Sequence, residues 1–335
     1  MNVSSVLRDT PFSILDRSRI REGEDGPRAL RETVALAREA EALGFHRFWV
    51  SEHHGVPGVA GSAPTVLAAA VAAATSRIRV GTGGVMLPNH QPLVIAEQFG
   101  VLESLFPGRI DMGLGRSVGF TDAVRRALGA GKDAAGAFGG QVAELLGWFS
   151  GGQTAYPGVH AFPAEGLRPA PFLLATGSGA DLAAELGLPL VIGGIRGEDA
   201  MLRAVDRYRA AFRPSPWAAT PYVVLSGTVA VAPSTAEARR LLLPEAWSTA
   251  YSRTHGVFPP LLPPETVEAM TMTGPERDRF AAALAGQLHG SPTEVAAGLR
   301  ALLGRSGADE FLVTTSTYDR RRLLESHRLL ADLLT

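Results

Sequence analysis

Residues 78–116 read IRVGTGGVMLPNHQPLVIAEQFGVLESLFPGRIDMGLGR. The stretch predicts a strand over Ile78–Leu87 and a helix that begins at Pro92 and ends near Pro107. A second strand follows over Arg109–Gly113. Two strands joined by a helix are typical of parallel strands, because a parallel pair needs a crossover connection. This strand–helix–strand unit therefore predicts a parallel sheet covered by helices.

The same alternation continues along most of the chain. Further strands are predicted over Phe12–Leu15, Phe48–Ser51, Phe172–Ala175, Leu190–Ile192, Tyr222–Val231 and Glu310–Thr315. Helical patterns are predicted over Arg28–Leu43, Ser62–Thr75, Phe138–Phe149 and Glu198–Phe212, and between the strand Phe172–Ala175 and Gly187. Three more helices begin at Ser234, Ser291 and Asp319. Eight such units predict one domain over residues 1–335, a closed (β/α)8 TIM barrel with insertions in its loops. An open doubly wound sheet is the alternative.

Two stretches interrupt this rhythm and are longer than ordinary loops. Val118–Phe138 is rich in Gly and Ala, and we expect a mobile loop there. Pro244–Pro275 contains two Pro–Pro pairs, and we expect a long insertion there. Each stretch is therefore either functional or disordered.

Composition narrows the class of protein. Hydrophobic residues make up 46% of the 335 residues, and 32 Lys and Arg nearly balance 33 Asp and Glu. This balance argues against a disordered chain, and nucleic acid is not an expected partner because basic runs are absent. The longest apolar run, Val66–Ala74, is shorter than the roughly 20 residues of a membrane span. A chain with no cysteine and no secretory pattern fits a cytoplasmic protein.

In a barrel, the residues that follow the strands meet at one end and form the active site. The strand Phe48–Ser51 is followed by Glu52, His53 and His54. Neighbouring residues of an extended chain point to opposite sides, so the two histidines are not expected to share a metal ion. One imidazole in the pocket could act as acid, base or hydrogen-bond donor. The alternative is a pair of structural histidines at the edge of the barrel.

Two other histidines are less favoured as functional groups. His90, at the end of the strand Ile78–Leu87, is a weaker pocket candidate than His53. His327 lies among leucines of the last predicted helix, where a core or interface position is expected.

Glycine-rich turns supply a second group of candidates. Thr176, Gly177, Ser178 and Gly179 lie between a predicted strand and a helix, where small residues, hydroxyls and helix amides can bind a phosphate. A plain helix cap is the alternative interpretation there. Gly83-Gly84 interrupts an otherwise apolar strand, which indicates the close approach of a flat ligand or an unusual peptide conformation.

The turn Gly113–Gly119 has the spacing GxGxxxG, a poor match to the dinucleotide-binding fingerprint. Arg116 on this turn is more informative, because a guanidinium among glycines can reach a phosphate or a carbonyl oxygen. An ordinary surface salt bridge is the alternative role for Arg116.

Taken together, several segments resemble the bacterial luciferase-like flavin monooxygenases. The resemblance is dense from about Phe12 to Arg116 and patchier toward the C-terminus. The segments that carry it are FWVSEHH (48–54), SAP (62–64), TSRIRVGTGGVMLP (75–88), AEQF (96–99), PGRID (107–111), GLGR (113–116), AAELGLP (183–189) and GSP (290–292).

The resemblance implies a barrel that binds FMN, usually as reduced FMN delivered by a separate flavin reductase. It implies that O2 and the flavin form a C4a-peroxide that oxygenates a small apolar organic substrate. By position, His53 matches an acid/base near the flavin, and Gly83-Gly84 matches a non-proline cis peptide beneath the isoalloxazine ring. Cofactor contacts are likewise implied for Met86, Arg116, Thr176, Gly177, Ser178 and Gly179. No metal ligands are expected.

The resemblance also implies a homodimer formed by the helices 63–75 and 92–105, with His54 and Glu97 meeting across subunits. The composition suggests a high-GC genome, in which this family often serves natural-product tailoring such as antibiotic biosynthesis. The expected substrate walls are apolar and lie near Phe12, Leu15, Trp49, Met86 and Ile192.

Two departures from the family pattern keep other functions open. Gly115 stands where the luciferase proper has a reactive cysteine, and a phosphate-binding arginine is replaced near Gly139-Gly140. The alternatives are a deazaflavin-dependent dehydrogenase of the same fold, a non-catalytic flavin-binding protein and, from another class, a metal hydrolase on a barrel.

Overall fold

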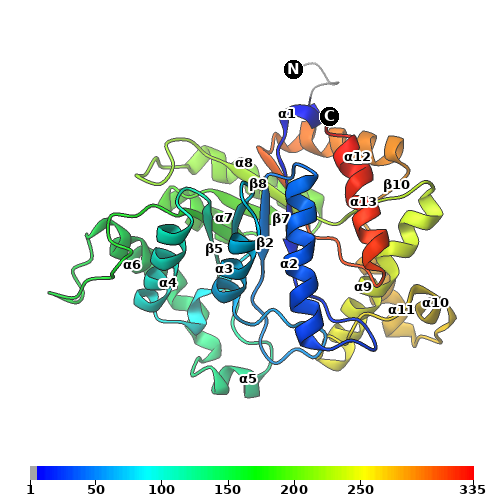
Figure 1. Cartoon of the computed structure of the whole chain (residues 1–335), viewed down its shortest axis with the longest axis horizontal. Helices are drawn as coiled ribbons and strands as arrows, with labels where there is room; N and C mark the ends of the chain where they lie inside the picture. The colour runs from blue at the N-terminus through cyan, green and yellow to red at the C-terminus, as the bar shows by residue number, and fades with distance from the viewer. Residues whose placement is uncertain (1–5) are drawn as a thin grey trace.

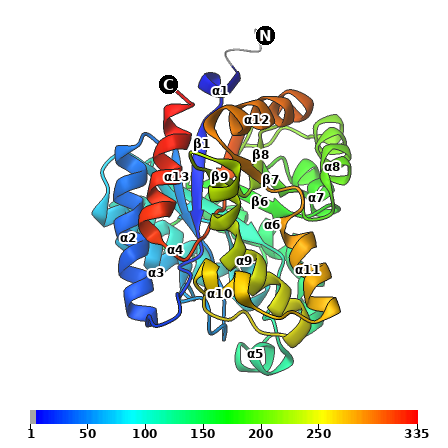
Figure 2. The same cartoon turned by 90° about the vertical axis from the view of Figure 1, so that its right-hand side faces the viewer.

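The computed structural model of the protein describes residues 6–335, in which parallel strands close into a barrel surrounded by helices (Figures 1 and 2). The order around the barrel is β3-β2-β1-β11-β8-β7-β6-β5, and β3 pairs with β5 to close it. This closure confirms the predicted (β/α)8 barrel and rules out the open doubly wound sheet. The strands are β1 (Phe12–Asp16), β2 (Arg47–Val50), β3 (Arg79–Thr82), β4 (Val85–Met86), β5 (Ile110–Gly115), β6 (Ala170–Ala175), β7 (Leu190–Gly193), β8 (Val223–Gly227) and β11 (Glu310–Val313).

Helices cover the outer face of the barrel. The longer ones are α2 (Gly26–Ala42), α3 (Pro64–Ala74), α4 (Pro92–Leu105), α6 (Phe138–Ser150), α7 (Gly179–Leu186), α8 (Glu198–Ala211), α9 (Thr235–His255), α12 (Pro292–Ser306) and α13 (Arg320–Asp332). Local signals fix several of their starts. Ser291 and Glu294, for example, form the predicted capping box of α12, with Pro292 in its first turn. No helix of the described residues is both long and apolar enough to cross a membrane.

Two predicted strands are each split in the structure. The strand predicted over Ile78–Leu87 divides into β3 and β4 around Gly83-Gly84, and both parts pair with β5. The strand predicted over Tyr222–Val231 divides into β8 and β9 (Val229–Val231). The reason is that β9 leaves the barrel and pairs with β10 (Leu288–Gly290) in a separate two-stranded sheet.

Both stretches that interrupt the rhythm contain helices, and the insertion expected from Pro244 begins only after α9 ends at His255. Residues 118–138 contain α5 (Asp122–Ala127), capped by the Thr121 side chain, and the 3-10 helix η2 (Lys132–Ala137). Pro244 lies inside α9 rather than at the start of an insertion. Beyond α9, α10 (Pro264–Ala269) and α11 (Gly274–Leu284) pack back on it around a cluster of Leu243, Trp247 and Val267.

One end of the barrel interior is filled by buried ionic and aromatic side chains. The Arg47 guanidinium donates to Asp111 at 2.9 Å and to Glu310 at 3.0 Å. Trp49 Nε1 also donates to Asp111 at 2.9 Å, and the Tyr222 hydroxyl donates to Glu310 at 2.8 Å. The two carboxylates raise the pKa of Arg47, although burial opposes them, so the charges remain paired. The opposite end, at which the strands terminate, is therefore where a ligand site is expected.

Candidate active site

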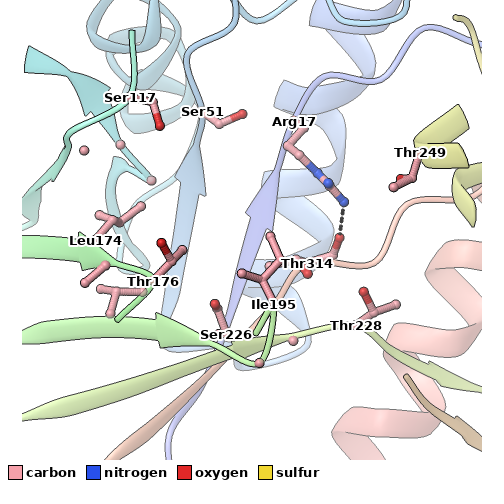
Figure 3. A pocket seen from close by; sticks show the side chains of 18 of the residues that line it. Arg17, Ser51, Ser117, Leu174, Thr176, Ile195, Ser226, Thr228, Thr249 and Thr314 are labelled. Carbon is pink, nitrogen blue, oxygen red and sulfur yellow. Dashed lines mark hydrogen bonds between the residues drawn. The ribbon is translucent and has the colours of Figure 1, made fainter. Parts of the chain in front are cut away.

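A cavity of about 1380 Å³ occupies the end of the barrel at which the strands terminate. Its wall is formed by the segments that follow β1, β2, β3, β5, β6, β7 and β8, together with α9 and α11. Figure 3 shows side chains from several of these strand ends, including Ser51, Thr176 and Ser226, around one space. The cavity is therefore the place where the sequence-predicted site residues are expected to meet.

His53 follows β2 and lines this cavity. Its backbone N–H donates to Gly61 at 2.8 Å, and its Nδ1 lies 3.2 Å from Ser51 Oγ. Burial, together with the positive charges of Arg17 and Arg19, lowers the pKa of His53 to about 4. The imidazole is therefore neutral at pH 7. Its Nε2 has no hydrogen-bond partner within residues 6–335 and is available to a ligand in the cavity.

Glu52 and His54 occupy the neighbouring positions but make separate contacts. Glu52 Oε1 lies 2.7 Å from His54 Nε2 and 2.8 Å from His90 Nε2, and Oε2 accepts the backbone N–H of Met86 at 2.9 Å. Burial would raise the pKa of Glu52, but hydrogen bonds from the two histidines lower it to about 2. Glu52 is therefore an ionised, buried carboxylate. As the alternation of side chains predicts, His53 and His54 do not share a partner.

Glu52, His54 and His90 could also serve as metal ligands. One ligand atom from each lies within 4.8 Å of the other two. Carboxylate oxygen and imidazole nitrogen are donors that zinc accepts. However, the hydrogen bonds between the three groups satisfy the same atoms without an ion. His90 does not line the cavity, in keeping with its lower rank as a pocket candidate, and the adjacency of β2 and β3 brings it to Glu52 instead.

Gly83 and Gly84 form part of the cavity wall, and the peptide bond between them is cis. A Cβ on Gly83 would stand 2.7 Å from Leu15 Cδ1 and 3.2 Å from Trp49 Cε3. A Cβ on Gly84 would stand 2.8 Å from the carbonyl oxygen of Gly113. Gly84 therefore requires glycine because the clash is with rigid backbone, whereas the clash at Gly83 is with the end of the flexible Leu15 side chain. Together the two residues present bare backbone to the cavity.

The remaining predicted cofactor residues also gather at this end of the barrel. Met86 and Arg116 line the cavity, and the exposed Arg116 side chain has no ion pair within residues 6–335. Thr176, Ser178 and Gly179 line it as well, whereas Gly177 lines a smaller cavity beside it. The structure thus brings every predicted site residue to one region.

The expected apolar walls are mostly elsewhere. Met86 lines the large cavity and Ile192 lines the smaller one, but Phe12, Leu15 and Trp49 are buried in the barrel. They are not walls because the side chains of a closed barrel interdigitate and fill its interior. The expectation of a largely apolar wall is therefore wrong for these three residues.

Sequence analysis missed Arg17 and the contribution of α9. Arg17 directly follows β1, forms an ion pair with Glu245 of α9 and donates to the Thr314 carbonyl at 2.6 Å (Figure 3). The rule that selected His53, namely position directly after a strand, would also have selected Arg17. Thr249 of α9 lines the cavity too, but it lies within the insertion expected over Pro244–Pro275, to which the sequence assigned no site residue.

A closed parallel barrel with a large cavity where its strands end defines the chain as a (β/α)8 barrel protein with the architecture of an enzyme. Its sequence matches the family model described as "Luciferase-like monooxygenase" over residues 10–310. The chain belongs to the luciferase-like monooxygenase family and is an enzyme of that family.

Individual proteins show the same relationship. A luciferase-like monooxygenase of Escherichia coli K12 is 36% identical over 331 residues, which is 96% of each chain. The crystal structure of apo-MsnO8 has a TM-score of 0.85 at 32% identity and covers 98% of each chain. The oxygenating component of 3,6-diketocamphane monooxygenase from Pseudomonas putida, solved in complex with FMN, shares the fold. Its TM-score is 0.73 at 19% identity, over 96% of this chain and 97% of that one.

Proposed function

We propose that this protein is a monooxygenase that binds reduced FMN in the large cavity and uses O2 to oxygenate a small organic molecule. Membership of the luciferase-like family supports the reaction class. The observation that carries the choice of a flavin is the bare backbone of Gly83-Gly84, which faces the same cavity as the neutral His53.

The residues present fit a flavin. Single-ligand pockets typically have volumes of roughly 300–1000 Å³, so a cavity of about 1380 Å³ has room for a cofactor and a substrate together. A planar ring system can lie against the glycine backbone, since no side chain stands in its way. Thr176 and Ser178 offer hydroxyls on another side of the cavity, where a phosphate tail could bind.

Reduced FMN, when bound, would supply the electrons that activate O2. The chain's own contribution is to hold a proton at a defined atom and to exclude water. With Nδ1 facing Ser51, the neutral His53 can donate or accept a proton at Nε2 toward the oxygen that reacts beside the ring. The barrel wall around the cavity limits the access of water to that reaction.

The substrate that we propose offers hydrogen-bonding groups as well as apolar surface. Ser226, Thr228 and Thr249 line the cavity and place hydroxyl groups around one part of it (Figure 3). Leu174 and Ile195 supply apolar contacts nearby. A wholly apolar substrate would leave those hydroxyls without partners, which costs binding free energy.

We further propose that a separate reductase supplies the reduced flavin. Gly113 and Gly115 lie within β5 itself, so this glycine run is not the strand-to-helix loop of a dinucleotide site. A cytoplasmic location, where reduced nicotinamide cofactors are available to such a reductase, is part of the same proposal.

A homodimer through α3 and α4 is the assembly that we propose. The two helices are adjacent (Figure 1). They expose Val66, Val94, Val101 and Leu105, of which Val66 is 70% and Leu105 62% exposed. Apolar side chains grouped on one face of a soluble protein favour association with a partner surface. A dimer mass by light scattering that reverts to a monomer mass in Val66→Asp would support this assembly. A monomeric wild-type protein would contradict it.

The test of the function is rapid mixing of the protein and anaerobically reduced FMN with oxygenated buffer, followed by absorbance. We expect a transient that outlives the reoxidation of free reduced FMN, and product when a substrate is included. Reoxidation at the free-flavin rate across a substrate panel would contradict the proposal. Turnover under strictly anaerobic conditions with a deazaflavin would identify the dehydrogenase of the same fold instead.

A further inference from the structure

Helix α9 presents one continuous face to the large cavity. Five of its residues, at the spacing of successive helical turns, line that cavity: Leu242, Glu245, Ala246, Thr249 and Arg253. In Figure 3, Thr249 and Thr228 lie on one side of the space, whereas Thr176 lies on the other. Because Thr176 is one of the residues that we propose for the cofactor, α9 faces the part of the cavity that is left for a substrate.

The acidic side chains that line the cavity already have partners. Glu52 contacts His54, Glu198 contacts Arg305 and Glu245 contacts Arg17. Two arginines of the cavity wall, Arg116 and Arg253, form no ion pair with any acidic side chain within residues 6–335. A bound anion could therefore be the partner of either guanidinium.

Of these two arginines, Arg116 belongs to the cofactor side of the cavity. It directly follows β5, and Gly115 at the end of β5 pairs with Met86 of β4. Met86 is two residues from Gly84, against which we propose that the flavin ring lies. Among the described residues, Arg253 is then the unpaired arginine on the substrate side.

The C-terminus of α9 does not need the Arg253 side chain. A cation near the end of a helix ordinarily stabilises the helix dipole or binds the last carbonyl groups. Arg279 of α11 already does so, because its Nη1 donates to the Arg253 carbonyl at 2.6 Å and to Thr254 Oγ1 at 2.7 Å. The Arg253 guanidinium itself makes no hydrogen bond to any described residue, so its donors are available to a ligand.

Thr249 adds a second donor beside this guanidinium. It lies one helical turn before Arg253 on the same face of α9, and its hydroxyl makes no hydrogen bond to any described residue. The planar guanidinium can donate to both oxygens of a carboxylate, and the hydroxyl can donate to one of them. One guanidinium also balances the single negative charge of a carboxylate.

We propose that the substrate is an organic acid whose carboxylate binds Arg253 and Thr249. This proposal rests on the proposed function, because it assumes that the flavin occupies the side of the cavity at Gly83-Gly84. The Arg253 side chain is exposed, so the charged end of the acid stays near solvent, where its desolvation costs little. The carbon chain then extends inward past Leu242 and Ala246 toward the flavin.

The test uses three carboxylic acids and their primary amides: hexanoate, octanoate and 3-phenylpropanoate, each against its own amide. Calorimetry on the intact chain with FMN present measures the affinities. At least one acid should bind about tenfold more tightly than its amide, which is the effect of one charged hydrogen-bonding contact. Added salt should reduce this preference, because the guanidinium is exposed.

The variants identify the source of that preference. Arg253→Gln should abolish it and Thr249→Val should reduce it, while both variants bind FMN as the wild type does. Arg239→Gln removes an exposed arginine of α9 that lines neither cavity, so this control should keep the wild-type preference.

Other outcomes separate this proposal from the proposed function. If no acid binds more tightly than its amide, or if Arg253→Gln keeps the preference, the carboxylate site is wrong, and the rapid-mixing experiment still decides the function. An Arg253-dependent preference could also accompany reoxidation of reduced FMN at the free-flavin rate with every acid. That result would support the carboxylate site and contradict the proposed function. A preference that does not change with salt would contradict an exposed guanidinium as its source.

Discussion

Glu52 Oε2 accepts a hydrogen bond of 2.9 Å from the backbone N–H of Met86. Its other oxygen, Oε1, contacts the Nε2 atoms of His54 and His90. One buried carboxylate thus links the residues after β2 to β4 and η1 (Leu87–Asn89), next to Gly83-Gly84. This link positions the backbone against which we propose that the flavin ring lies.

We expect Glu52→Gln to lower the free energy of unfolding by about 1–3 kcal/mol, measured by urea denaturation at pH 7. The amide would place an NH2 donor against groups that themselves donate. Glu165→Gln is the control, since Glu165 contacts His160 at 2.8 Å on the surface and its pair should contribute well below 1 kcal/mol. Equal losses in the two variants would show that the buried position of Glu52 is unimportant.

We expect His53→Ala to retain reduced FMN and to lose oxygenation by about a hundredfold or more, the contribution typical of a positioned acid or base. The His53 side chain lines the cavity and is not part of a barrel strand, so its loss should lower the rate of oxygenation and leave flavin binding unchanged. Ser51→Ala, which removes only the contact to Nδ1, should cause a smaller loss. Product formation that is unchanged in His53→Ala, measured per bound flavin, would exclude the role.

The pH dependence of the reaction follows from the pKa of His53, which burial lowers to about 4. Between pH 5.5 and pH 8 the imidazole stays neutral, so its titration should leave the single-turnover rate of oxygenation unchanged. The rate should fall only as the pH approaches 4. An acid limb centred near pH 6.5 that disappears in His53→Ala would contradict this prediction.

Gly84→Ala should disrupt the cofactor site, because the new methyl group would stand 2.8 Å from the Gly113 carbonyl oxygen. The backbone must shift to relieve that contact, so we expect both thermal stability and FMN affinity to fall. Gly194→Ala is the matched control: Gly194 lines the same cavity, and a Cβ there meets nothing within 4 Å. Similar FMN affinities in the two variants would mean that the shape at Gly84 does not matter.

The barrel could be predicted from sequence because each strand–helix unit carries local signals, such as the capping box at Ser291 and Glu294. The breaks at Gly83-Gly84 and after Gly227 were harder to predict. Apolar residues lie on both sides of each break, and only pairing with distant strands shows where β3 and β8 end. The helices within 118–138 and after α9 were missed because Gly and Pro there interrupt a weak helical periodicity.

Site residues could be predicted from the sequence where they directly follow a predicted strand. His53, Arg116 and Thr176 follow strands, and the barrel rule alone places them at one end. Contacts between residues far apart in the sequence could not be predicted, because no local pattern marks them. Glu52 and His90 are 38 residues apart, and Arg17 and Thr314 are 297 residues apart. Only the closed barrel brings them together.

His327 on α13 is 1% exposed, and its ring centroid lies 5.9 Å from that of Phe45, which confirms the expected core position. Neither ring nitrogen has a hydrogen-bond partner among the described residues. Burial lowers the pKa of His327 from the ordinary 6.5 to about 4. The unfolded chain therefore binds the proton more tightly than the folded protein. Stability falls accordingly as the pH drops from about 6.5 to about 4.

We expect His327→Leu to remove this part of the acid sensitivity, since leucine fills the same apolar site and does not titrate. The pKa of His327 is about 4 in the folded protein and 6.5 in the unfolded chain. Because of this difference, the free energy of unfolding of the wild type should fall by about 2 kcal/mol between pH 7.5 and pH 5. Urea unfolding at both pH values measures it. The lowered pKa of His53 acts with the same sign but is present in both proteins, so the difference between their pH dependences isolates His327. If the two proteins lose equal stability on acidification, the pKa of His327 is not lowered in the folded protein, and the prediction is wrong.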